Sequence, residues 1–178
     1  MLIPGFLITL ITFPGVIVHE IAHRFFCDIT RTPVYDVGYF RVRGNPAGYV
    51  IHGRPRRIRD ALLISVGPLL VNTVLCAALT FGAAYEMWVL DAGLSDPVLF
   101  VLAWLGISIG MHAFPSAQDM TSFRERVAEE HDSGLIPTLA KVAAGFFRVA
   151  NVLRIFWFDA IYALGTAVAV PLLIASAI

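Results

Sequence analysis

The stretch Val16-Ile17-Val18-His19-Glu20-Ile21-Ala22-His23 decides how the rest of the chain is interpreted. In a helix, residues four positions apart lie on the same face, so His19 and His23 can bind one metal ion through their imidazole nitrogens. Glu20 can reach a metal-bound water without binding the metal itself. Nearly every residue before His19 is apolar, which predicts that this HExxH motif lies on a membrane helix.

The composition is typical of an integral membrane protein. The chain has 178 residues, of which 58% are hydrophobic and 15% are charged, whereas soluble domains usually carry about 25% charged residues. Lys and Arg together number 13, as do Asp and Glu, so the net charge indicates no acidic partner such as nucleic acid. We expect one domain, residues 1–178, embedded in the lipid bilayer, with its N-terminal apolar run retained as a span.

Four apolar runs predict an all-α polytopic membrane protein with about four transmembrane helices. The runs cover residues 2–26, 61–84, 98–113 and 155–178. Pro4 and the Pro14-Gly15 pair are expected to bend the first helix, which should end shortly after His23. In the segment 34–52, β-branched and aromatic residues flank the turn Gly44-Asn45-Pro46-Ala47-Gly48 and predict a small β-hairpin between spans one and two.

The distribution of charge predicts the orientation. Eight arginines lie between spans one and two or at their ends: Arg24, Arg31, Arg41, Arg43, Arg54, Arg56, Arg57 and Arg59. The loop 85–97 carries only acidic charges. The positive-inside rule therefore places the first loop in the cytoplasm and both termini outside, in a multi-pass protein of the cell membrane with its active site toward the cytoplasm. A solvated charged helix is expected at 124–132, followed by a segment along the membrane surface.

A catalytic zinc site needs a third protein ligand and leaves its fourth position to water. Spans one and three both run inward, so Asp119 is expected at about the depth of the two histidines. Ionisable residues near membrane depth are usually functional, and Asp119 is the predicted third ligand. Glu129 and Glu130 lie in a stretch typical of a solvated helix face. Asp159 has possible partners in Arg154 and Arg148.

These residues resemble the site-2 protease family of intramembrane zinc metalloproteases. The resemblance covers about residues 5–120 and rests on three motifs in order. They are the HExxH at 19–23, Gly67-Pro68 followed by Asn72, and Phe114-Pro115 with Asp119. The chain leaves no room for a PDZ-like domain, so the resemblance implies a compact member.

The sequence departs from the family pattern in three places. Gln118-Asp119-Met120 lacks the glycine of the family's Leu-Asp-Gly. Asn72 falls one residue later than usual, which turns it by about 100° on a helix. His112 replaces an asparagine three residues before the proline. We therefore expect His112 either to assist catalysis, by donating to an oxyanion or orienting Asp119, or to be hydrogen-bonded within the bundle.

The resemblance implies hydrolysis of a peptide bond within or next to a transmembrane segment of a single-span membrane protein. One zinc ion held by His19, His23 and Asp119 activates water, and Glu20 transfers the proton to the leaving nitrogen. The hairpin either supplies an edge strand for the extended substrate or is a connector. Asn72 either lies near the active site or makes an interhelical hydrogen bond. Gly67-Pro68 permits close helix approach or a bend.

Two other functions remain open from the sequence. The first is a catalytically inactive membrane adaptor that keeps the fold, although a scaffold has no need for Glu20. The second is a zinc protease of another membrane family, acting on the soluble side with a glutamate ligand from 125–130.

Overall fold

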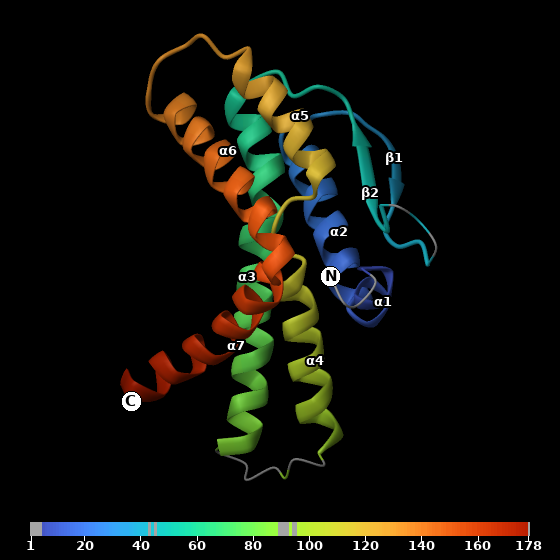
Figure 1. The fold of residues 1–178 in the computed structure, drawn as a ribbon, viewed down its shortest axis with the longest axis vertical. Helices are drawn as coiled ribbons and strands as arrows, with labels where there is room; N and C mark the ends of the chain where they lie inside the picture. Colours follow the sequence, from blue (N-terminus) through green and yellow to red (C-terminus); the bar gives the residue numbers. More distant parts are fainter. Residues whose placement is uncertain (1–4, 43, 45, 89–92, 94–95, 178) are drawn as a thin grey trace.

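Helices dominate the fold of this chain, which a computed structural model describes at residues 5–42, 44, 46–88, 93 and 96–177 (Figure 1). The elements are α1 (Gly5–Ile11), α2 (Phe13–Ile29), β1 (Val34–Gly38), β2 (Tyr49–His52), α3 (Ile58–Trp88), α4 (Pro97–Met111), α5 (Ala117–Ala128), α6 (Leu135–Leu153), η1 (Arg154–Phe156) and α7 (Phe158–Ala177). Pro4, Arg43, Asn45, most of the acidic loop and residue 178 lie outside the described residues.

The first predicted helix is divided in two. The chain leaves helical geometry at Thr12, whose hydroxyl donates to the carbonyl of Ile8. Pro14 lies in the first turn of α2, where its missing N–H is tolerated. The expected bend therefore takes the form of a break just before the proline. The helix also continues to Ile29, six residues beyond His23 and three beyond the predicted end of the span at residue 26.

The predicted hairpin is confirmed as a two-stranded antiparallel sheet. The register pairs Gly38 with Tyr49 and Val34 with His52, with an irregularity between Val34 and Asp36. The Tyr49 hydroxyl donates to an Asp36 carboxylate oxygen at 2.8 Å. The sheet lies beside α2, and β2 leads directly toward α3 (Figure 1).

α3 is the long axis of the molecule, with α4 packed against its lower half (Figure 1). Among the described residues, α3 alone is a single helix long and apolar enough to cross a bilayer. The α6–η1 segment and α7 meet the same criterion only as a pair, bent by 97°. α4 is apolar but has 15 residues, and an expected span is about 20. An all-α fold with a small hairpin is shown, whereas four membrane crossings are not established.

Two boundaries near the end of the chain differ from the expectation. Helix α5 begins at Ala117, so Asp119 belongs to its first turn and not to the end of α4. The fourth predicted span begins inside a helical region: α6 runs through the stretch before it, and Trp157, at φ 61°, separates η1 from α7. The main buried apolar cluster joins α3, α5 and α6 to the 113–114 turn, with Phe123 and Phe147 at its centre.

Candidate metal centre

Helix α2 presents the two histidines of the HExxH motif side by side. Both side chains are buried, and their ring centroids are 4.7 Å apart. Close packing of α2 on α4 brings them next to the 112–116 turn, because Gly15 has no side chain. A Cβ atom on Gly15 would lie 2.0 Å from the Ser108 carbonyl oxygen. The absence of a side chain at Gly15 thus lets α2 approach α4 closely, and this places α2 next to the turn that follows α4.

Asp119 reaches the histidines from the first turn of α5. Its Oδ2 atom lies 3.4 Å from Nε2 of His23 and 3.8 Å from Nε2 of His19. The same oxygen accepts the Ser116 backbone N–H at 2.8 Å, and the Ser116 hydroxyl accepts the Asp119 N–H. This reciprocal cap begins α5 and fixes the direction of the carboxylate.

The electrostatics favour an ionised carboxylate at this position. Burial alone would raise the pKa of Asp119, but the neighbouring imidazoles of His23 and His19 outweigh it. They hold the pKa of this carboxyl well below its usual value. Asp119 is therefore available as an anionic ligand at neutral pH.

The three side chains fit a metal ion. One ligand atom from each of His19, His23 and Asp119 lies within 4.8 Å of the others. Zinc–ligand bonds of about 2.0–2.1 Å in a tetrahedral site place neighbouring ligand atoms roughly 3.3 Å apart, close to the two distances above. His23 Nε2 is buried and has no hydrogen-bond partner among the described residues. Two imidazole nitrogens and a carboxylate oxygen at these distances form a donor set that suits a metal ion.

Backbone support orients the first histidine. Nδ1 of His19 donates to the His112 carbonyl oxygen at 2.6 Å, so in the neutral, metal-binding form of the ring Nε2 carries the lone pair and faces Asp119. Asn72, with 0% of its surface exposed, donates to the same carbonyl at 2.9 Å and to the Ile109 carbonyl at 3.1 Å. The predicted interhelical hydrogen bond of Asn72 is thus present, and it converges on the contact that holds His19.

His112 makes hydrogen bonds in the site through its main-chain carbonyl and through its ring. Its Nε2 atom lies 2.8 Å from the hydroxyl of Thr12, in a hydrogen bond across the break between α1 and α2. Of the predicted alternatives, hydrogen bonding within the bundle is the one observed. The residue also lines the site cavity, and its carbonyl orients His19. A role of His112 in catalysis stays a prediction.

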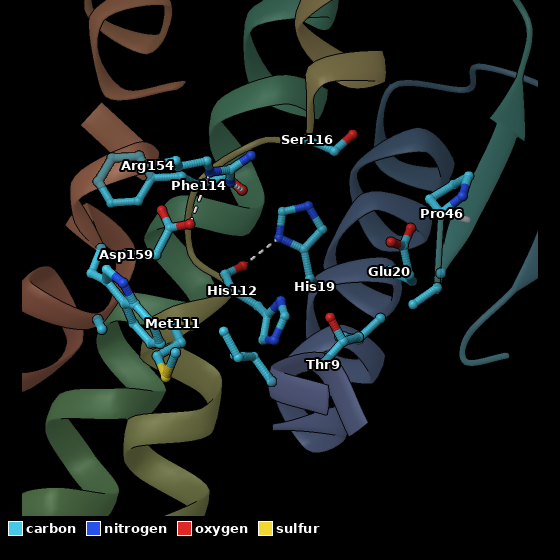
Figure 2. Close-up of a pocket in the computed structure, with 16 residues that line it drawn as sticks. Thr9, His19, Glu20, Pro46, Met111, His112, Phe114, Ser116, Arg154 and Asp159 are labelled. Atoms are coloured by element: carbon cyan, nitrogen blue, oxygen red, sulfur yellow. Dashed lines mark hydrogen bonds and ion pairs between the residues drawn. The ribbon is translucent and has the colours of Figure 1, made fainter. Parts of the chain in front are cut away.

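Figure 2 shows His19, His112 and Glu20 around a cavity of about 300 Å³. Its remaining walls come from α1, the hairpin turn at 46–48 and the bend between α6 and α7. The turn lies directly over Glu20: a Cβ atom on Gly48 would be 2.7 Å from Glu20 Cγ and 2.9 Å from its Oε1. Glu20 is therefore confined between α2 and the hairpin turn and is not part of the metal-binding group.

A second cavity of about 220 Å³ adjoins the metal-binding group. His23 and Asp119 line it, together with polar side chains. These are His52, Ser65, Gln118, Ser122 and Arg126. The candidate ligands therefore border two cavities, one that also contains Glu20 and one lined by polar and apolar groups of α3, α5 and the hairpin.

The competing carboxylates have other partners. Glu129 forms an ion pair with Arg54, and Glu130 pairs with Arg126 at 3.0 Å. Asp159 pairs with Arg154 at 2.9 Å, as one of the predicted alternatives had it. In the part of the chain that the structure describes, the only metal-ligand group is that of α2 and α5.

The structure adds residues that sequence reasoning missed. Ser116 caps the helix that carries Asp119, and the Ser-x-x-Asp spacing is a sequence signal that could have identified it. Thr12 gave no such signal, because its partner lies far away in the chain. Arg154 was predicted only as a possible partner of Asp159, and its contact with Phe114 was missed for the same reason. Gly67 and Pro68 lie apart from the ligands; Gly67 faces the Phe26 ring and permits close approach of α3 to α2.

Comparison with family models, with curated proteins and with solved structures found no match for this chain.

Proposed function

We propose that this chain is an intramembrane zinc metalloprotease, which hydrolyses a peptide bond within or next to a transmembrane segment of a single-span membrane protein. One observation carries the proposal: His19, His23 and Asp119 converge on a common point, while Glu20 from the same motif lines the adjoining cavity and stays outside the ligand group. A metal-binding scaffold needs the three ligands but has no use for that glutamate.

Each residue has a defined task in this proposal. His19, His23 and Asp119 would hold one zinc ion, which when bound supplies Lewis acidity that polarises a carbonyl oxygen and makes water nucleophilic at neutral pH. Glu20 accepts the proton of the attacking water and delivers it to the leaving nitrogen. The His112 carbonyl keeps His19 in the required tautomer, and Asn72 fixes that carbonyl.

The two cavities suit the two reactants of a hydrolysis. The Glu20 cavity is bounded by the hairpin turn, whose strands offer edges on which an extended peptide can form backbone hydrogen bonds. The cavity at His23 and Asp119 includes the polar side chains of His52, Gln118 and Arg126, which can hydrogen-bond to water. We infer that substrate occupies the first cavity and that water arrives through the second.

A position in the cell membrane is part of the proposal. α1–α2, α3, α4 and α7 would provide four crossings; α4, with 15 residues, is shorter than a standard span of about 20 residues, whereas α7 has 20. The arginine-rich segment before α3 lies at the upper end of the molecule, opposite the C-terminal end of α3 (Figure 1). This arrangement agrees with a metal centre toward the cytoplasmic side and acidic residues outside.

Glu20→Gln is the direct test. The amide cannot accept the water proton, so cleavage of a transmembrane reporter should fall by about 10²- to 10⁴-fold. Zinc content should remain at one ion per chain, because Glu20 is not a ligand. His23→Ala is the matched control and should lose zinc and cleavage together. An E20Q protein that cleaves at the wild-type rate would contradict the assignment, and a wild-type protein that binds zinc without cleaving any membrane protein would indicate the inactive adaptor.

A further inference from the structure

The turn between α4 and α5 carries both supports of the candidate metal centre. At one end, the His112 carbonyl accepts from His19 Nδ1. At the other end, Ser116 forms the reciprocal cap with Asp119. Only three residues separate the two supports, so the conformation of this turn sets the distance between a histidine of α2 and the carboxylate of α5.

The side chain of Arg154, far away in the sequence, holds the middle of this turn. Its Nη2 atom donates to the Phe114 carbonyl oxygen at 3.0 Å. Phe114 is itself 4% exposed, and its ring packs against those of Phe158 and Tyr162. Aromatic packing thus fixes the ring of Phe114, and a charged donor fixes its carbonyl group. A hydrogen bond from a charged donor is stronger than one from a neutral donor.

Two further contacts orient the guanidinium of Arg154. Nη1 donates to the side-chain oxygen of Asn151 at 2.9 Å, and Nε lies 2.9 Å from Oδ2 of Asp159. Arg154 stands at the C-terminal end of α6 and Asp159 in the first turn of α7, where each charge complements its helix dipole. The 97° bend between the helices turns the pair toward the cavity, where Figure 2 shows both residues beside the 112–116 turn.

The ion pair between Arg154 and Asp159, taken alone, would stabilise only the bend between α6 and α7. The Nη2 contact is different, because it leaves the bend and ends on the turn that carries the two supports. Both Arg154 and Asp159 also line the cavity that contains His19 and Glu20. The C-terminal region is therefore joined to the site by a specific hydrogen bond in addition to apolar packing.

We propose that Arg154 is a positioning residue of the metal centre: through the Phe114 carbonyl it holds the 112–116 turn in the conformation in which His19 and Asp119 face one another. This inference rests on the proposed function. Arg154 is not one of the metal ligands, and this positioning role does not depend on contact with a substrate in the cavity that it lines. It acts through the turn, and Asn151 and Asp159 act through Arg154.

The test compares Arg154→Ala with Arg154→Lys and with Arg148→Ala, an exposed cation on the same helix. Zinc affinity of the detergent-solubilised full chain is measured by competition with a chromophoric chelator, and the cobalt-substituted protein is examined by visible absorption. Loss of an outer hydrogen-bond partner typically costs 10- to 100-fold in metal affinity, and we expect about tenfold for R154A. R154K, which keeps one donor for Phe114, should recover part of the loss. R148A should match wild type.

The outcomes separate this inference from the proposed function. A folded R154A protein with wild-type zinc affinity and an unchanged cobalt spectrum would overturn it, even if cleavage were slower. If R154A does not fold, Asn151→Ala and Asp159→Asn each remove one anchor of the guanidinium and should weaken zinc binding to a smaller extent. Wild-type affinity in both would also overturn it. Retention of zinc by His23→Ala would instead show that the proposed centre is wrong.

Discussion

One oxygen atom of Asp119 has two roles, as part of a helix cap and as a candidate metal ligand. Its Oδ2 accepts the Ser116 N–H and also faces both histidines. An alanine variant therefore removes a helix cap and a ligand together, and a loss of metal binding would not identify the cause. Asparagine separates the two tasks, because its side-chain oxygen can accept the Ser116 N–H while its negative charge is gone.

We expect Asp119→Asn and Asp119→Ala to lose zinc affinity alike, by more than the roughly 10- to 100-fold cost of an outer hydrogen bond. They should differ in stability. Loss of an N-terminal cap interaction costs about 1 kcal/mol, so the metal-free alanine protein should unfold at a lower temperature than the metal-free asparagine protein. Isothermal titration with zinc and thermal unfolding in chelator measure the two effects. Full zinc binding by D119N would remove Asp119 from the ligand set.

At the scale of the elements, the hairpin turn and α2 form one unit around Glu20. Gly48 approaches Glu20 and Val16 so closely that no side chain fits between them. The described backbone of Gly48 is not in the left-handed region, so a substitution there acts through steric contact alone.

Gly48→Ala should displace the turn or the Glu20 side chain and leave the metal ligands in place. Misplacement of a reacting group by about 1 Å can cost up to about 100-fold in rate. We therefore expect slower cleavage with unchanged zinc affinity. Gly145→Ala, on α6 with no atom within 4 Å of the added carbon, is the control and should behave as wild type. Equal cleavage by G48A and G145A would show that the turn does not constrain Glu20.

Element types were predictable from the sequence, and several boundaries were not. The turn at 44–48 and its β-branched flanks predicted the hairpin, and the apolar runs predicted α3 and α4. The Pro14-Gly15 pair predicted a bend in the first helix, but the hydrogen bond between Thr12 and His112, a hundred residues away, could not be predicted from a local pattern. Helix α6 was missed as a separate element because its apolar residues occur on a helix that also carries Lys141 and Arg148.

Some features of the candidate site could likewise be predicted from the sequence, and others could not. His19, Glu20 and His23 follow from helix spacing, and the order of spans predicted that Asp119 would join the histidines, which the ligand geometry bears out. The Arg154 contact with Phe114 could not be inferred, because it depends on the bend between α6 and α7.

For the whole molecule, the proposed position in the membrane predicts which residues are accessible from each side. The proposed topology places the start of α3 in the cytoplasm and its end outside. In a chain whose Cys27 and Cys76 are replaced by serine, Glu86→Cys should react with a membrane-impermeant thiol reagent in intact cells. Arg56→Cys should react only after permeabilisation. Arg56 lies just before α3 and Glu86 lies in its last turn, so the two positions report on opposite ends of one helix and each is a control for the other. The reverse labelling pattern would invert the topology.

The shared oxygen of Asp119 also bears on which ion the site prefers. Because the Ser116 amide fixes the carboxylate before any ion arrives, the spacing of the ligands belongs to the fold and not to the metal. A larger cation, with oxygen ligands at 2.3–2.6 Å as for calcium, has to widen the group against the start of α5. A small tetrahedral ion that accepts nitrogen ligands meets no such resistance. Selectivity among metals would then reside in the cap of a helix.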